Sequence, residues 1–228
     1  MPHPLDDLLR RIDPEGTILD VGCLNFAQVR RANQLGLTKF KHFGVDYSES
    51  ADVPPGFQFA KVDLNQERLP FDDDKFDLVI ASHVIEHLAL PIPFFADCVR
   101  ICKPGGLLYF EAPSERSLLL PGMPFDREKF FSISFFDDPT HMYRPWTPQA
   151  FYRLTRYFSC EPLKVGHLTS WKHRLAFPII LAYALVTKNG KWLEQCVWGA
   201  VGWSSYLMVR KPIDLLGQPS FKYYIPKR

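Results

Sequence analysis

Thr17-Ile-Leu-Asp-Val-Gly-Cys23 is the stretch that decides the fold, because it is a short apolar run that ends in an acid and a glycine. An amphipathic segment from Ala27 to Leu35 follows it and stops at Gly36. Short apolar runs are typical of buried strands, and apolar residues spaced three and four apart are typical of helices. The sequence therefore predicts a strand, a turn and a helix.

Further apolar runs follow at 42–47, 57–63, 76–84 and 106–113. Their near-continuous apolar character is typical of strands buried on both faces of a parallel sheet. Between the last two, residues 85–102 are predicted to form a helix interrupted by prolines, which closes on a turn at Lys103-Pro-Gly-Gly106. This alternation predicts an α/β fold with a doubly wound, mostly parallel sheet.

The second half of the chain has a different character. Residues 114–148 are rich in Phe, Pro, Ser and Asp without a clear period, and we expect them to form a partly ordered lid. Thr147 is predicted to cap a helix that runs to about Tyr157, and strands at 161–168 and 205–211 complete a seven-stranded sheet. The apolar, Trp-rich block 171–203 is predicted to be a helical insertion before the last strand.

Length and composition bound the class of protein. The 228 residues, 46% hydrophobic and 23% charged, fit one globular domain over 1–228. A formal net charge of +2 gives no global field toward nucleic acid, so we expect no nucleic-acid partner.

The five cysteines are odd in number and lack redox or zinc spacing, so we expect a reducing compartment, no disulfides and no metal site. The first eleven residues lack the apolar core of a signal peptide, which favours a cytoplasmic protein. The longest apolar stretch, 175–186, is too short to span a bilayer.

Three predicted strands end in an acid: Asp20, Asp46 and Asp63. The carboxyl edge is where open α/β sheets bind ligands. A carboxylate after the second strand suits a ribose diol, because each oxygen can accept a hydrogen bond from one hydroxyl. The alternative is that these acids only cap the turns that follow them. Three acids in register favour a nucleoside-containing cofactor.

A dinucleotide site requires G-x-G-x-x-G, whereas Gly22 is followed by Cys-Leu-Asn-Phe. A nicotinamide-dependent oxidoreductase is therefore disfavoured. The combination of segments resembles the class I S-adenosylmethionine-dependent methyltransferases, whose cofactor is S-adenosyl-L-methionine. The segments that carry the resemblance are Ile18-Leu-Asp-Val-Gly-Cys23, Phe43-Gly-Val-Asp46, Val62-Asp-Leu64 with Leu69-Pro-Phe71, Phe76-Asp-Leu-Val-Ile-Ala-Ser-His-Val-Ile-Glu-His-Leu88 and Lys103-Pro-Gly-Gly-Leu-Leu108.

The resemblance implies a Rossmann-like methyltransferase fold in which residues 17–113 form the cofactor-binding half. Gly22 and the loop after it would face the methionine part, Asp20 would orient that loop, and Asp46 would hold the ribose hydroxyls. Three residues would surround the adenine: Tyr47, Asp63 and Leu64.

The end of the fourth predicted strand would lie near the reacting centre. The resemblance implies that Ser82 and His83 lie beside the amino-acid moiety and the sulfonium. His87, one helical turn later, has a structural interpretation as a packed or capping group.

The loop after Gly22 departs from the family pattern. Leu24 and Phe26 stand where the family usually has small residues. Asn25 tolerates a left-handed conformation, so we expect the loop to turn there and Asn25 to belong to the cofactor site. The alternative is a catalytically inactive, methyltransferase-like binding or scaffold protein.

Asp138-Pro-Thr-His141-Met-Tyr-Arg-Pro-Trp-Thr-Pro148 resembles a stretch of small-molecule O-methyltransferases of the ubiquinone-biosynthesis and glycan-modifying kinds. This implies an oxygen of a small molecule or glycan as acceptor. Without a metal such an acceptor requires a base, for which His141 and His83 are the candidates. We favour His141, because a neighbouring sulfonium should lower the basicity of His83 and a lid residue can be buried only when substrate is bound. Alternatively, His141 only ties the lid to the body.

The block 171–203 carries cations at its margins: Lys172, His173, Arg174, Lys188 and Lys191. An apolar face flanked by cations can lie on an anionic membrane surface or hold a lipid-linked acceptor. The alternatives are a core element or a contact between two copies in a homodimer.

Overall fold

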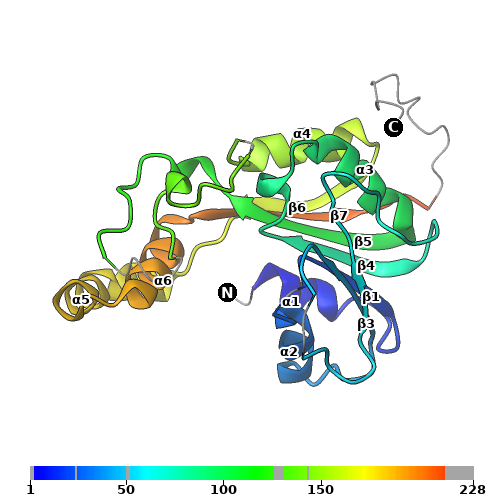
Figure 1. Ribbon diagram of the computed structural model, residues 1–228, viewed down its shortest axis with the longest axis horizontal. Coiled ribbons are helices and arrows are strands. Elements are labelled where there is room, and N and C mark those ends of the chain that lie inside the picture. Colours follow the sequence, from blue (N-terminus) through cyan, green and yellow to red (C-terminus); the bar gives the residue numbers. More distant parts are fainter. Residues whose placement is uncertain (1–2, 24, 50–51, 126–130, 143, 214–228) are drawn as a thin grey trace.

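A computed structural model describes residues 3–23, 25–49, 52–125, 131–142 and 144–213, and its centre is one sheet (Figure 1). The sheet has seven strands in the order β3-β2-β1-β4-β5-β7-β6. β7 runs antiparallel to β5 and β6, and the other neighbouring pairs are parallel. The predicted mostly parallel, seven-stranded α/β sheet is thereby confirmed. The strands are β1 (Thr17–Val21), β2 (Lys41–Asp46), β3 (Gln58–Lys61), β4 (Phe76–Ser82), β5 (Cys102–Pro113), β6 (Glu161–His167) and β7 (Ser204–Arg210).

Helices cover both faces of the sheet (Figure 1). α1 (Pro4–Leu9) and α2 (Ala27–Gln34) pack on one face, and α3 (Pro91–Ile101) and α4 (Pro148–Tyr157) pack on the other. α4 begins as predicted, because the Thr147 hydroxyl accepts a hydrogen bond from the Ala150 amide at 2.9 Å. Three short 3₁₀ helices complete the described elements: η1 (Ile85–His87), η2 (Glu115–Ser117) and η3 (Phe135–Asp137).

The segment after β4 differs from its prediction. The helix expected over 85–102 is divided into η1 and α3, which begins at Pro91 because proline suits the first position of a helix. The turn predicted at 103–106 is the start of β5, where Cys102 pairs with Phe76 before the register shifts. Gly105, with φ of +76°, provides the bend that was expected from a separate turn.

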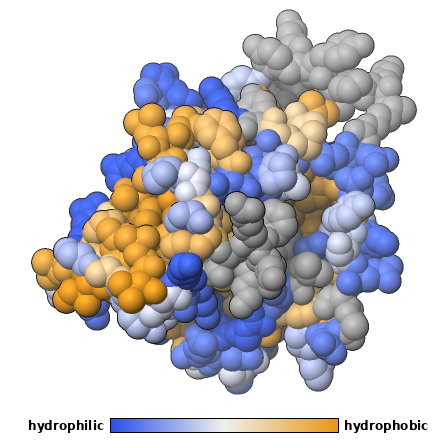
Figure 2. Space-filling view, turned by 60° about the vertical axis from the view of Figure 1, so that its left-hand side comes forward, coloured by the Kyte–Doolittle hydropathy of each residue, from blue (hydrophilic) through white to orange (hydrophobic). Residues whose placement is uncertain are grey.

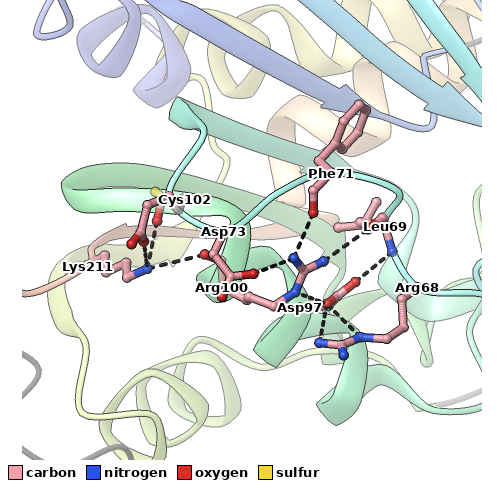
Figure 3. A network of polar contacts seen from close by, with 9 residues as sticks. Arg68, Leu69, Phe71, Asp73, Asp97, Arg100, Cys102 and Lys211 are labelled. Atoms are coloured by element: carbon pink, nitrogen blue, oxygen red, sulfur yellow. Dashed lines mark hydrogen bonds and ion pairs between the residues drawn. The ribbon is translucent and has the colours of Figure 1, made fainter.

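Residues 62–75 connect β3 to β4 and contain no helix. An ionic network holds this connection in place (Figure 3). The Arg100 guanidinium donates to the Asp97 carboxylate at 2.7 Å and to the carbonyl oxygens of Leu69 and Phe71. Asp97 in turn accepts from the Leu69 amide at 2.6 Å. Lys211 donates to the Cys102 carbonyl oxygen at 2.7 Å. The network therefore fixes against α3 and β5 a segment that lacks backbone ladders of its own.

The predicted helical insertion consists of α5 (Trp171–Thr187) and α6 (Gly190–Val201), which extend beyond the end of the sheet (Figure 1). One side of α5 packs through Phe177, Leu181 and Ala184 against α6 and Ile133. The other side exposes four large apolar residues, which we name the apolar strip: Leu175, Ile179, Tyr183 and Val186. Figure 2 shows apolar residues gathered over this part of the surface. Among the described residues no helix combines the length and apolar composition needed to cross a membrane.

Candidate active site

Acidic side chains meet at the carboxyl edge of the sheet, beside β1. The strand order reverses there, because β2 lies on one side of β1 and β4 on the other. Such a reversal is where doubly wound sheets bind ligands. Burial, and then the charge of Asp46, raise the pKa of Asp20 to about 8. The two strand-end acids therefore repel each other, and a cationic group placed between them would relieve that repulsion.

Gly22 makes the turn that follows β1. Its φ is +75°, and a Cβ at this position would lie 2.6 Å from Cγ2 of Val84. A side chain is thus excluded by both conformation and space. The amide of Gly22 donates to the carbonyl oxygen of Val45 at 2.9 Å. This turn brings the acidic end of β1 against the residues that follow β4.

The loop after Gly22 has a left-handed residue at Phe26, with φ of +50°. The Phe26 ring is buried edge-on against Phe57, with 4.9 Å between ring centroids. Its bulk therefore packs in a small cluster beside the loop. Leu24 lies outside the described residues, so the left-handed conformation of Asn25, whose φ depends on residue 24, stays a prediction. The Asn25 side chain accepts from the Ala27 amide at 3.1 Å, at the start of α2.

The acids after β2 and β3 make capping bonds. Oδ1 of Asp46 accepts from the Ser48 amide at 3.0 Å, and Oδ1 of Asp63 accepts from the Asn65 amide at 3.0 Å. A carboxylate has about four acceptor positions, so a cap does not exclude ribose binding. Tyr47 is 70% exposed beside Asp46, and Leu64 packs partly buried against the core. The capping and cofactor interpretations of Asp46 and Asp63 are therefore compatible.

His83 follows Ser82 at the end of β4 and lies between two carboxylates. Its Nδ1 is 3.2 Å from Glu86 Oε1, and its Nε2 is 3.2 Å from Glu111 Oε1. Burial alone would lower the pKa of His83, but the hydrogen bonds and charges of Glu111 and Glu86 outweigh it and raise the pKa to about 10. The ring also stacks on Trp198, with 5.6 Å between centroids. Glu86 and Glu111 therefore raise the basicity of His83, which we expected to be low. They also contact both of its ring nitrogens.

His141 and His87 face each other beside Glu86. Their ring centroids are 5.0 Å apart. One ligand atom from each of Glu86, His87 and His141 lies within 4.8 Å of those of the other two. The His141 side chain is only 5% exposed and stacks on Phe135 at 4.3 Å. The expectation that His141 is buried only with substrate is thus wrong, because the described lid residues already pack it against η1.

Sequence reasoning missed Glu86, Glu111 and Trp198. Glu86 and Glu111 each stand inside an apolar run, and both are buried. A carboxylate at such a position needs a partner, and this was the available signal. Trp198 gave no signal, because its contact with His83 depends on how the insertion folds back.

The comparisons agree on one family. Residues 19–110 match the family model described as "Methyltransferase domain". A Mycolicibacterium smegmatis protein named as a probable S-adenosylmethionine-dependent methyltransferase is 29% identical over 108 residues, 46% of this chain and 40% of that protein. A ubiquinone biosynthesis O-methyltransferase of Maricaulis maris is 33% identical over 99 residues, 40% of this chain and 38% of that protein. The chain thus matches about two-fifths of the length of these relatives.

Solved structures share the fold. An S-adenosylmethionine-dependent methyltransferase from Mesorhizobium loti superposes with a TM-score of 0.60 at 16% identity, covering 90% of this chain and 96% of that one. The [4+2]-cyclase SpnF superposes with a TM-score of 0.62 at 20% identity, covering 92% of this chain and 81% of that one. Together with the strand order and the glycine turn after β1, the match over residues 19–110, two-fifths of the chain, supports the class I S-adenosylmethionine-dependent methyltransferase superfamily for this chain.

Proposed function

We propose that this chain transfers the methyl group of S-adenosylmethionine to an oxygen of a small-molecule or glycan acceptor. One juxtaposition carries the proposal. Gly22, two residues after Asp20, lies against Val84, two residues before Glu86, so the turn after β1 adjoins the segment that begins the Glu86–His87–His141 cluster. A cationic donor suits the two strand-end acids, and a hydroxyl that must lose a proton suits the cluster.

On the donor side, Asp46 holds the ribose hydroxyls, and Gly22 and Asn25 line the methionine part. Tyr47, Asp63 and Leu64 surround the adenine, and Ser82 and His83 lie beside the amino-acid moiety. The raised pKa of Asp20 supports a cationic ligand, because the sulfonium and ammonium groups would offset the repulsion between two carboxylates.

On the acceptor side, His141 activates the hydroxyl. The oxygen forms a bond to the methyl carbon as the sulfur–carbon bond breaks, the electron pair of that bond stays on sulfur, and the hydroxyl proton passes to the imidazole of His141. His141 suits this role better than His83, because Glu86 and Glu111 occupy both nitrogens of His83. The name of the Maricaulis maris relative, an O-methyltransferase, supports an oxygen acceptor.

The rival function is an inactive binding or scaffold protein. The burial of Phe26 against Phe57 weakens one argument for it, because this bulky side chain has a place of its own. The [4+2]-cyclase among the structural neighbours is a reminder that the fold alone does not determine the reaction.

Two measurements on the full chain decide between these functions. Calorimetry should detect binding of S-adenosylmethionine and of its demethylated product. A radiolabelled methyl donor offered with pooled phenols, catechols and glycans should then label an acceptor. Labelling that resists base hydrolysis and is sensitive to ether cleavage indicates an oxygen ether. Cofactor binding without any transfer across these acceptors would favour the scaffold function.

We further propose that the insertion holds the enzyme on an anionic membrane surface. The apolar strip spans one side of α5, and Lys172, Arg174, Lys188 and Lys191 are exposed around it. Glu194 is the acidic residue of α5 and α6, and it bonds the Ser132 amide at 2.8 Å. An exposed apolar face flanked by cations that make no ion pair with the described residues fits an anionic lipid surface better than a second copy of the same cationic face.

Sedimentation with phosphatidylglycerol vesicles tests this surface. Leu175→Glu and Ile179→Glu should reduce vesicle binding more than tenfold, because each removes an apolar side chain and adds a repelled charge. Tyr152→Glu, at an exposed aromatic position on α4 outside the apolar strip, is the control and should bind nearly as wild type. A concentration-dependent dimer that both α5 variants abolish, with no vesicle binding, would instead assign the strip to a homodimer.

A further inference from the structure

Glu86 has an oxygen without a hydrogen-bond partner among the described residues. The residue is fully buried, and Oε2 is the unpartnered atom, while Oε1 lies 3.2 Å from Nδ1 of His83. Leaving a buried polar atom unsatisfied costs about 1–3 kcal/mol, and more for a charged group. The fold retains this cost at the place where two imidazoles converge.

Both imidazoles are oriented by their Nδ1 atoms. Nδ1 of His141 lies 2.7 Å from the carbonyl oxygen of Phe135, which can only accept, so Nδ1 is the donor. Nδ1 of His87 lies 3.2 Å from the carbonyl oxygen of Thr140 and is a donor by the same argument. Each ring therefore carries its lone pair on Nε2. Metal-bound histidines are usually fixed in this way, with the second nitrogen donating to a carbonyl or carboxylate.

We propose that Glu86, His87 and His141 bind one divalent first-row transition-metal cation through Oε2 and the two Nε2 atoms. One ligand atom of each residue, an imidazole nitrogen or a carboxylate oxygen, already lies within 4.8 Å of those of the other two. Atoms that share one ion lie about 3–3.5 Å apart. A movement of about 1 Å at each of the ligand atoms, by side-chain rotation, would therefore close the site. Two imidazoles and one carboxylate favour such ions over Mg²⁺ or Ca²⁺.

The site deepens the proposed function and rests on it for its role. Three protein ligands leave coordination positions open, and an acceptor hydroxyl bound there would have a lowered pKa. With the cation bound, His141 would act on the oxygen as a ligand of the cation and not as the base, and the hydroxyl proton would pass to solvent. The methyl carbon is attacked by the same oxygen, and the bonds formed and broken are those given above.

A second acid supports the charge balance. Asp138 Oδ2 lies 3.8 Å from Nε2 of His141, and Asp138 Oδ1 accepts from the Thr140 hydroxyl at 2.6 Å. Thr140 in turn contacts Nδ1 of His87 at 3.0 Å. The lid therefore places one further carboxylate near the proposed ligand atom of His141, and the same carboxylate holds the Thr140 hydroxyl that contacts His87.

Cobalt(II) is the probe for the test. The full chain is stripped with a chelator and titrated with Co²⁺ without cofactor or acceptor, and its visible absorption and bound metal are measured. We expect one Co²⁺ per chain, displaced by Zn²⁺. Glu86→Gln and His141→Ala should each weaken binding at least tenfold. His42→Ala, which removes an imidazole from β2 outside the cluster, should leave binding unchanged.

Circular dichroism of each variant confirms folding, and His87→Ala, at a less buried position, serves if Glu86→Gln fails to fold. Absence of stoichiometric binding, or equal binding by wild type and the variants, overturns the metal site. The two proposals separate cleanly. Stoichiometric binding that depends on these residues supports the site even if no oxygen is methylated, whereas oxygen methylation that survives chelation overturns the site and leaves the proposed function intact.

Discussion

Two clusters of polar side chains in this protein differ in whether their buried polar atoms all have hydrogen-bond partners. The network around Arg100 gives the Asp97 carboxylate three different donors, and the guanidinium reaches two carbonyl oxygens (Figure 3). The cluster at Glu86, His87 and His141 leaves a buried carboxylate oxygen unpartnered among the described residues. A completed network stabilises a fold, whereas an incomplete one retains a cost that a ligand can remove. The difference separates a structural network from a candidate site.

Removing a side chain from the incomplete cluster should have the largest effect. His141→Ala should lower the rate of methyl transfer by about 10²- to 10⁴-fold, because the acceptor oxygen is no longer activated. The affinity for the cofactor product, measured by calorimetry, should stay nearly intact. A variant with wild-type turnover would assign activation to another group or leave positioning as the whole of catalysis.

Breaking the complete network should act on stability instead. Asp97→Ala leaves the partly buried Arg100 without its buried carboxylate partner and should cost about 3 kcal/mol of unfolding free energy in denaturant titration. Turnover of the folded fraction should not change. Asp73→Ala removes an exposed partner of the same arginine and should change stability little. If Asp97→Ala instead lost turnover without losing stability, the network around Arg100 would not be purely structural.

Asp46 tests the donor side. Asp46→Ala should weaken cofactor-product binding by at least tenfold, because each charge-assisted hydrogen bond to the ribose contributes about 1.5–3 kcal/mol. Thermal stability should fall much less, since the bond to the Ser48 amide is a local cap. Unchanged affinity together with lower stability would make Asp46 a cap and nothing more.

The last prediction concerns the dependence of stability on pH. The pKa of Asp20 is raised to about 8 in the fold, above its ordinary value of 3.8, so folding favours the protonated form. Its contribution to stability is complete below about pH 4 and is lost as the pH rises toward 8. Asp20→Asn should remove this slope from plots of unfolding free energy against pH. An identical slope in wild type and variant would contradict the raised pKa of Asp20, whose main cause is burial.

The predictable part of the molecule is the part governed by local pattern. The strands of the cofactor-binding half, the cap at Thr147 and the helical insertion follow from apolar periodicity and turn chemistry. The start of β5 was mistaken for a turn, because Lys103-Pro-Gly-Gly106 has the composition of one while Cys102 pairs with Phe76. The conformation of that segment depends on pairing between β4 and β5, and a local sequence pattern carries no information about such pairing.

The sequence predicted which residues lie at the edge of the sheet, but it did not predict which side chains contact one another there. Asp20 and Asp46 were expected together from the sheet edge alone. The two carboxylates around His83 were not expected, because Glu111 comes from β5 and Glu86 from η1. His141 was chosen as a lid residue, but its packing on Phe135 and its approach to His87 depend on a segment without periodicity.

The insertion leaves and rejoins the sheet at neighbouring points. His167 of β6 is paired with Ser205 of β7, and the Leu168 amide donates to the Ser204 carbonyl oxygen at 2.8 Å. Since the entropy of closing a loop grows only slowly with its length, a hairpin pinned at such a point tolerates connections of very different size. Residues 168–203 are therefore a long connection between two antiparallel strands that are paired where it begins and ends. A connection of another length or shape can therefore replace residues 168–203 while the pairing of β6 with β7 stays the same.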